Sequence, residues 1–185
     1  MAKKLIFLFF IFILIGGGFF YWWQNQKDVR ELNKTLPEGL KIVKNLIGNE
    51  YGVVNKIDGY EFKVPKEWEG FKTIEYTPKR SELGYTAASI NMESKEGSKG
   101  LITIDQFENL EKIDLKFWAE DNFRVLGLTG RFVEDKLGEF NIVKTQESVH
   151  LGGMFVYFFQ KDLVIYAVTG DSEDFIHYII INGKW

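Results

Sequence analysis

Cysteine is absent from this 185-residue chain, and histidine is scarce, with two residues at His150 and His177. The lack of cysteine excludes disulfide bonds, thiol catalysis, cysteine metal sites and a lipid-modified cysteine anchor. The two histidines lie in different predicted elements, and neither has a second histidine or a motif-spaced acid beside it. We therefore predict that both have structural roles and that the chain binds no metal and no cofactor.

Sequence motifs of common enzyme classes are also missing. No serine lies in a G-x-S-x-G or S-x-x-K pattern, and the stretches GLTG and HLGGM lack the lysine and spacing of a phosphate-binding loop. The adjacent acids Glu120-Asp121 and Glu134-Asp135 point apart on a helix or strand, so neither pair forms a catalytic dyad by itself. We predict that the protein is not an enzyme, with a hydrolase that assembles carboxylates from distant segments as the alternative.

The charge balance argues against nucleic acid as a partner. The chain has 23 lysine and arginine residues against 26 aspartate and glutamate residues, which gives a net charge of −3. Binding to nucleic acid depends mainly on the neutralisation of phosphates by basic side chains. We therefore expect no nucleic-acid partner.

An uncharged and largely apolar run, LIFLFFIFILIGGGFFYWW, occupies residues 5–23 and follows two lysines. As a helix, its 19 residues extend roughly 28 Å, close to the ~30 Å thickness of a bilayer core. The closing YWW is typical of the aromatic belt at a membrane interface. The run therefore predicts a transmembrane signal-anchor helix at 5–23, preceded by a cytoplasmic N-terminus at 1–4.

A cleaved signal peptide is the alternative interpretation of this segment, with residues 5–15 as its apolar region. No A-x-A-like cleavage site follows, and large aromatic residues extend the run beyond the three glycines. In both interpretations residues 24–185 lie outside the cytoplasm. We predict a single-pass protein of a bacterial cell membrane, bound to the membrane through its N-terminal helix, with an extracytoplasmic C-terminal domain.

Beyond this run we predict a stem at 24–39 and a single domain at 40–185. The stem carries a short helix that ends before Pro37, because proline disfavours helix at the preceding residue. From Leu40 the apolar period changes to two, which indicates strands. Strand patterns follow at 40–46, 51–57, 60–64, 71–78, 87–93, 101–107, 131–137 and 140–149.

Two helices are predicted within the domain. Residues 114–126 carry one apolar stripe, with Asp114 as the N-cap and with Ile113 and Trp118 as a hydrophobic staple. The last segment, 171–185, begins with acidic capping residues and carries a second apolar stripe. Each helix therefore has one face to bury against a sheet.

Two apolar runs, 154–159 and 163–168, are separated only by a short polar turn. Strands that are apolar on both faces are covered on both sides. We therefore predict an α+β fold in which a mostly antiparallel β-sheet has helices packed on both faces. This architecture is an α/β/α sandwich, preceded by one transmembrane helix.

Trp68 and Trp185 are the two candidate binding residues, and each follows a lysine-containing polar segment. Exposed rings would offer a platform for a sugar or a peptide, whereas buried rings would seal the ends of a core. Large aromatic side chains contribute most to stability when they are buried. We favour sealing and keep binding at Trp68 and Trp185 as the alternative.

Two segments carry a family resemblance. The first fits the pattern G-aromatic-x-F-x-x-P-x-x-W through Gly59, Tyr60, Phe62, Pro65 and Trp68. The second is a terminal helix with an acidic or serine cap and a short tail, matched by Ser172, Phe175 and Trp185. With these features the chain resembles the PsbP-like superfamily over about residues 50–185. The resemblance implies an antiparallel sheet between helices.

Known members of that superfamily are mostly non-enzymatic. They include extrinsic photosystem subunits, bacterial lipoproteins and a branch that binds a small GTPase. This chain departs from the lipoproteins because it lacks a lipidated cysteine, and nothing in it reproduces photosystem-specific residues. The resemblance therefore implies a PsbP-like extracytoplasmic domain without a photosystem role.

Three functions follow as expectations. The favoured one is a membrane-anchored, extracytoplasmic and non-catalytic binding or accessory domain of an envelope protein complex. The first alternative is a cell-wall or small-ligand binding domain that uses exposed aromatic residues. The second alternative is an envelope hydrolase that uses carboxylates.

Overall fold

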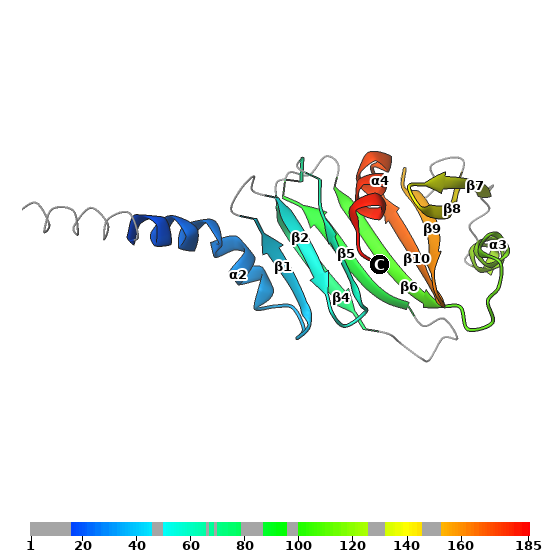
Figure 1. The fold of residues 1–185 in the computed structure, drawn as a ribbon, viewed down its shortest axis with the longest axis horizontal. Helices are drawn as coiled ribbons and strands as arrows, with labels where there is room; N and C mark the ends of the chain where they lie inside the picture. The colour runs from blue at the N-terminus through cyan, green and yellow to red at the C-terminus, as the bar shows by residue number, and fades with distance from the viewer. Residues whose placement is uncertain are drawn as a thin grey trace, which may run out of the picture.

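The computed structural model describes residues 16–45, 50–65, 67–68, 70–78, 87–95, 100–125, 132–145 and 153–185. In these residues ten strands form one sheet of three strands and one of seven, and the helices α2, α3 and α4 pack beside them (Figure 1). Residues 16–25 are helical and precede α2, so this part of the chain projects from the sheets as an arm (Figure 1).

The smaller sheet has the order β1-β2-β3, and both of its pairs are antiparallel. Its strands are β1 (Leu40–Lys44), β2 (Tyr51–Asn55) and β3 (Tyr60–Lys63). Ile42 lies opposite Val53, and Val53 lies opposite Phe62; these three side chains are at most 3% exposed. Lys41 and Lys63, their neighbours in sequence, face solvent. The alternation of apolar and polar residues therefore determines which face of this sheet is buried.

The larger sheet has the order β4-β5-β6-β10-β9-β8-β7, and every pair in it is antiparallel. Its strands are β4 (Phe71–Thr77), β5 (Ala87–Ser94), β6 (Leu101–Glu108), β7 (Phe132–Leu137), β8 (Phe140–Thr145), β9 (Phe155–Lys161) and β10 (Val164–Gly170). β6 and β10 are neighbours although α3 and three strands lie between them in the sequence. The centre of the sheet therefore joins distant parts of the chain.

The main hydrophobic core lies between the two sheets and is completed by α4 (Glu173–Asn182). β5 and β6 contribute Ile90 and Ile104, and α4 contributes Ile176 and Ile179, all with 0% exposure. Burial of one such side chain stabilises a fold by about 1.5–3 kcal/mol. The helix and both sheets therefore share one core.

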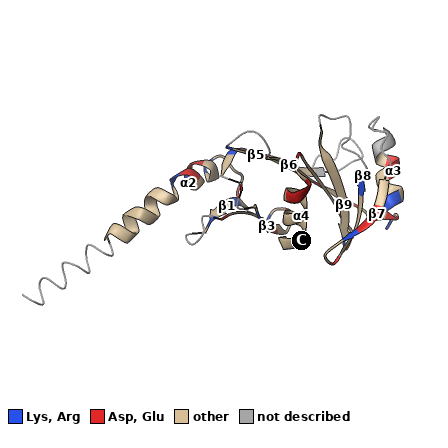
Figure 2. Cartoon of the chain, turned by 90° about the horizontal axis from the view of Figure 1, so that it is seen from above, with Lys and Arg blue, Asp and Glu red and all other residues tan. Residues whose placement is uncertain are grey.

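A second core lies on the opposite face of the larger sheet, under α3 (Leu115–Val125). In β9, Tyr157 and Phe159 belong to the main core, whereas Phe158 belongs to the second one. Trp118 of α3 packs against Phe158 with ring centroids 5.9 Å apart. Figure 2 shows α4 and α3 on opposite sides of β9.

This layering contradicts the predicted α/β/α sandwich. One face of the larger sheet is covered by the smaller sheet together with α4, and the other face carries α3 over β7, β8 and β9. Both faces of β9 and β10 are buried, but a buried face does not reveal which kind of element covers it. The fold consists of two antiparallel sheets with short helices.

The predicted transmembrane helix at 5–23 is contradicted as well. Across the part of the chain that the structure describes, no helix is both long enough and apolar enough to cross a membrane. Of the predicted span, only residues 16–23 belong to the helical stretch 16–25, about 12 Å at 1.5 Å per residue, and residues 1–15 lie outside the described part. The polar helix α2 (Lys27–Asn33) follows. The predicted single-pass topology, membrane partner and extracytoplasmic location are contradicted with the span.

Candidate functional site

An open groove of about 640 Å³ lies where the start of α3 meets β7, β8 and β9. Its lining includes four carboxylates and one lysine, at Asp114, Glu134, Asp135, Glu139 and Lys161. Lys144 Nζ lies 3.2 Å from Asp135 and offsets its charge, so the unbalanced acids of the lining are Asp114, Glu134 and Glu139 against Lys161. Acidic residues of β7 lie beside α3 in Figure 2. The groove therefore attracts cationic groups.

The first of these carboxylates is positioned by the helix that follows it. Asp114 Oδ1 accepts hydrogen bonds from two amides in the first turn of α3, each at 3.0 Å. A side chain in this position satisfies amides that have no partner within the helix. The N-cap predicted from the sequence is confirmed, and it also places Asp114 at the rim of the groove.

The second carboxylate, Asp135, is held by its own strand and by β8. It accepts a hydrogen bond from the amide of Lys136 at 2.8 Å and lies 3.2 Å from Lys144 Nζ. These contacts lower the pKa of Asp135, and the amide hydrogen bond is the largest cause. Asp135 therefore stays ionised at neutral pH.

A hydrogen-bonded group of side chains lies on the other face of the sheet, between β9 and α4. The Tyr157 hydroxyl donates to a carboxylate oxygen of Glu173, and His177 Nε2 lies 3.0 Å from the same hydroxyl oxygen. Because a hydroxyl carries one proton, His177 Nε2 must donate a proton of its own. Burial and the Glu173 carboxylate raise the pKa of Tyr157, which stays neutral. The group fastens α4 to β9.

A polar network joins the two sheets at the turn between β2 and β3. Asp58 accepts hydrogen bonds from Asn55 Nδ2 at 2.6 Å and from the Tyr76 hydroxyl at 3.3 Å. Gln106 Nε2 donates to the Asp58 carbonyl at 3.0 Å. Burial and the Asp58 carboxylate raise the pKa of Tyr76 to about 12. The network therefore satisfies polar groups in the interior and ties this turn to β4 and β6.

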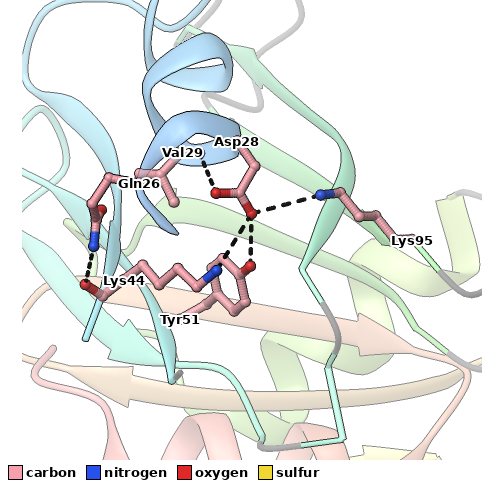
Figure 3. Close-up of polar contacts among 6 residues, drawn as sticks. All are labelled: Gln26, Asp28, Val29, Lys44, Tyr51 and Lys95. Carbon is pink, nitrogen blue, oxygen red and sulfur yellow. Dashed lines mark hydrogen bonds and ion pairs between the residues drawn. The ribbon is translucent and has the colours of Figure 1, made fainter. Parts of the chain in front are cut away.

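Asp28 of α2 is a third centre of polar contacts, shown in Figure 3. Its carboxylate accepts hydrogen bonds from the Tyr51 hydroxyl at 2.7 Å and from the Val29 amide at 2.9 Å. It also lies 3.7 Å from Lys44 Nζ and 3.6 Å from Lys95 Nζ. Burial by itself raises the pKa of Asp28, but the hydrogen bonds and the two lysines outweigh burial and lower it. Asp28 therefore ties α2 to both sheets.

Metal-ligating side chains do not gather in the described part of the chain. Within those residues, no group of three or more histidine, cysteine, aspartate or glutamate side chains could hold a metal ion. His177 belongs to the group around Tyr157. His150 lies outside the described residues.

Trp68 lies inside the main core. It is 2% exposed and packs against Phe71 and Phe175, with ring centroids 5.7 Å and 6.0 Å away. Neither ring contact involves Trp185, so the two candidate residues do not form a shared platform. A buried ring offers no open face for stacking.

Trp185 is half-buried in a ring of aromatic side chains. Its indole Nε1 donates to the Ile180 carbonyl at 3.1 Å. Its aromatic neighbours are Tyr60, Phe62, Phe159 and Tyr166. Main-chain hydrogen bonds between Lys184 and Glu61 hold the C-terminal residues against β3. These contacts are those of a residue that seals the core, and binding at Trp68 and Trp185 stays a prediction.

The prediction that Glu134 and Asp135 point apart is confirmed, because Glu134 lies opposite Val143 of the second core and Asp135 lies opposite Ile142 of the main core. The groove itself was not predicted, and Asp114 was identified only as a helix cap. The predicted hairpin between β7 and β8 was a usable indication that Glu134 and Glu139 belong to one edge of the sheet, with Glu139 in the turn after β7. The approach of Asp114 depends on how α3 packs over the sheet, which no local pattern reveals.

Comparisons with known proteins leave the family open. No family model and no curated protein matches this chain. Among solved structures, the crystal structure of a GTP binding regulator from Thermotoga maritima is similar, with 13% sequence identity and a TM-score of 0.37. The match covers 60% of this chain and 76% of that one.

Proposed function

We propose that this protein is a non-catalytic binding or accessory module of a protein complex, and that its acidic groove receives an extended basic segment of a protein partner. The observation that carries the proposal is the open groove, whose lining includes four acidic residues and one lysine, with one of the acids, Asp135, paired to Lys144. Complementary charge steers association and selects among partners. A lysine- or arginine-rich segment has the chemistry that complements this lining.

The position of β7 supports an extended partner. β7 is the last strand in the described order of the larger sheet, and Glu134, Asp135 and Lys136 in its middle are exposed. An edge strand presents amide and carbonyl groups to an added strand. Antiparallel pairing of β7 with a second copy of itself, centred on the strand, would set Glu134 opposite Asp135. Like charges in that arrangement repel, so a basic segment is favoured over a second copy.

A hydrolase that uses carboxylates is the competing function for the same groove. Asp114 and Asp135 accept main-chain hydrogen bonds, and the lowered pKa of Asp135 is the opposite of what a general acid needs. The other two acids, Glu134 and Glu139, are exposed. These contacts favour binding over catalysis. The resemblance to the PsbP-like superfamily is part of the proposal and points the same way, because its members are mostly non-enzymatic.

The proposal is tested by adding a short arginine-rich peptide to the full chain at low ionic strength. We expect binding that weakens as salt is added, together with slower amide hydrogen exchange in β7. The double variant Glu134→Gln, Glu139→Gln should weaken binding about fivefold, since exposed charges each contribute modestly. Glu75→Gln, an exposed acid of β4, is the matched control and should bind as the wild type does.

Two results would overturn the proposal. One is equal peptide binding by the double variant and the wild type. The other is protection from exchange in β4 in place of β7. Turnover of a hydrolase substrate that is lost in Glu134→Gln would favour the hydrolase.

A further inference from the structure

The outer edge of β1 is not paired with another strand among the described residues. Side chains from α2 and from the residue before it bind the outward main-chain groups of β1. Asn33, the last residue of α2, donates from Nδ2 to the Ile42 carbonyl at 2.9 Å and accepts from the Ile42 amide at 2.7 Å. Gln26, just before α2, donates from Nε2 to the Lys44 carbonyl at 3.0 Å. These side chains take hydrogen bonds that a neighbouring strand would otherwise make.

The register of the smaller sheet explains why those groups point outward. The Asn45 amide donates to the Glu50 carbonyl at 2.8 Å, so these two residues form a hydrogen-bonded pair. Hydrogen-bonded and non-hydrogen-bonded pairs alternate along an antiparallel ladder, which makes Ile42 and Val53 a non-hydrogen-bonded pair. The amide and carbonyl of Ile42 therefore point away from β2.

We propose that β1 is a concealed pairing edge for a second copy of this chain and that α2 is its removable cover. Antiparallel pairing around a two-fold axis at Ile42 would exchange both hydrogen bonds between the two Ile42 residues. This register sets Leu40 opposite Lys44 and Lys41 opposite Val43 of the second copy. No like charges face each other, in contrast to the self-pairing of β7.

The hold of α2 on the sheet is local. The helix has seven residues; Val29 is its one buried residue and reaches the main core, and Leu32 and Leu36 pack against that core while partly exposed. Its polar hold comes from Gln26 and Asn33 on β1 and from the Asp28 carboxylate. Local opening begins where a segment has few buried apolar contacts. With one buried residue among seven, α2 is therefore expected to open at lower free energy than the strands that build the core.

The first test removes the cover. In the full chain, Asn33→Ala with Gln26→Ala deletes the side-chain bonds to β1 and keeps the Asp28 contacts. Sedimentation velocity should show a dimer fraction at least about fivefold above that of the wild type, because the outward groups of β1 are freed. Glu31→Ala, an exposed residue of the same helix, is the matched control and should leave the fraction unchanged.

The second test identifies the interface through charge. Val43 is 38% exposed and would lie opposite Lys41 of the second copy. Val43→Glu creates two opposite-charge pairs in the dimer, and Val43→Lys creates two like-charge pairs. In the background without the cover bonds, Val43→Glu should dimerise about tenfold more tightly than Val43→Lys.

Circular dichroism and thermal melting establish that each variant is folded. A folded variant without the cover bonds that keeps the wild-type dimer fraction would overturn the proposal. So would a dimer whose affinity is the same with glutamate or lysine at position 43. If the double variant does not fold, the single variant Asn33→Ala, which frees both outward groups of Ile42, supplies the background for the same pair of Val43 substitutions. Equal dimerisation of those two variants rejects the interface.

Discussion

The edge strands β1 and β7, one in each sheet, are protected from further strand pairing in different ways. β1 lies under α2, whose side chains occupy its outward main-chain groups. β7 carries exposed charged residues and borders the acidic groove. Both devices oppose indiscriminate strand pairing. The helix α2 blocks the β1 edge to any partner, whereas the charges of β7 only favour some partners over others. Substitutions at the β1 edge should therefore mainly alter stability, and substitutions at β7 should mainly alter binding.

The largest effect is expected for Trp118→Ala, at the β7 end of the molecule. The ring is 8% exposed and packs against Phe107 and Phe158, with centroids 5.0 Å and 5.9 Å away. Its loss should lower the free energy of unfolding by about 3–5 kcal/mol. Peptide binding should fall as well, because α3 forms one wall of the groove. Urea denaturation followed by circular dichroism measures the change, and a loss below about 1 kcal/mol would show that α3 does not depend on this ring.

Asp28→Ala should have the next largest effect, at the β1 end. The substitution removes the acceptor of the Tyr51 hydroxyl and the carboxylate beside Lys44, whose side chain is only 10% exposed. We expect a loss of about 2–3 kcal/mol in the free energy of unfolding, as for hydrogen bonds to a charged group. Asp28→Asn keeps an acceptor and should lose less. If both variants match the wild type in denaturant, α2 is not held by this carboxylate.

The stability of α2 should also depend on pH in acid. The pKa of Asp28 is lowered from its usual 3.8 in the folded state, so the folded state binds this proton more weakly than the unfolded state does. The ionised carboxylate therefore stabilises the fold above pH 3.8, and this contribution is lost as the pH falls through the lower, folded pKa. The difference in stability between the wild type and Asp28→Ala should shrink below pH 3.8. A constant difference down to the acid limit of folding would contradict this sign.

Asn33→Ala should cost about 1–2 kcal/mol, because it removes two hydrogen bonds to the Ile42 main chain. Hydrogen exchange at the Ile42 amide should become faster, and exchange in β9 should stay slow. Native-state hydrogen exchange followed by NMR measures the Ile42 amide and the amides of β9 separately. Equal acceleration in β9 would mean that α2 and the core open together.

Glu134→Gln should have the smallest effect on stability, within about 0.5 kcal/mol, because the side chain is exposed on an edge strand. Binding of the arginine-rich peptide should nevertheless weaken about twofold. Thermal melting and a peptide titration on the same sample measure both quantities. The contrast between the two edges fails if Glu134→Gln destabilises the fold as much as Asn33→Ala does.

Most individual elements were predictable because their determinants are local. The predicted stem helix is confirmed as α2, and the helix after the Asp114 cap is confirmed as α3. The two apolar runs after residue 152 are confirmed as β9 and β10, whose residues alternate between the two cores. Helix caps and apolar periodicity depend on residues only a few positions apart, so they specify an element independently of the tertiary packing.

The layers and the groove were not predictable, because they depend on contacts between segments that are distant in the sequence. An apolar face of β9 is satisfied equally by a helix or by another sheet, and the main core is in fact built with β1, β2 and β3. The acidic residues that line the groove come from the N-cap of α3, from β7 and from the turn after β7. Their proximity depends on packing between elements far apart in sequence.

The sequence by itself determined the strands, the helix caps and the buried stripes of α3 and α4, because backbone preference and side-chain period are properties of short segments. Only the tertiary structure decided that β1, β2 and β3 form a sheet of their own, that α2 covers the β1 edge, and that β7 ends beside an acidic groove. Those features are contacts between segments distant in the chain. Many arrangements bury the same apolar faces, and the choice among them follows from the packing of the whole molecule.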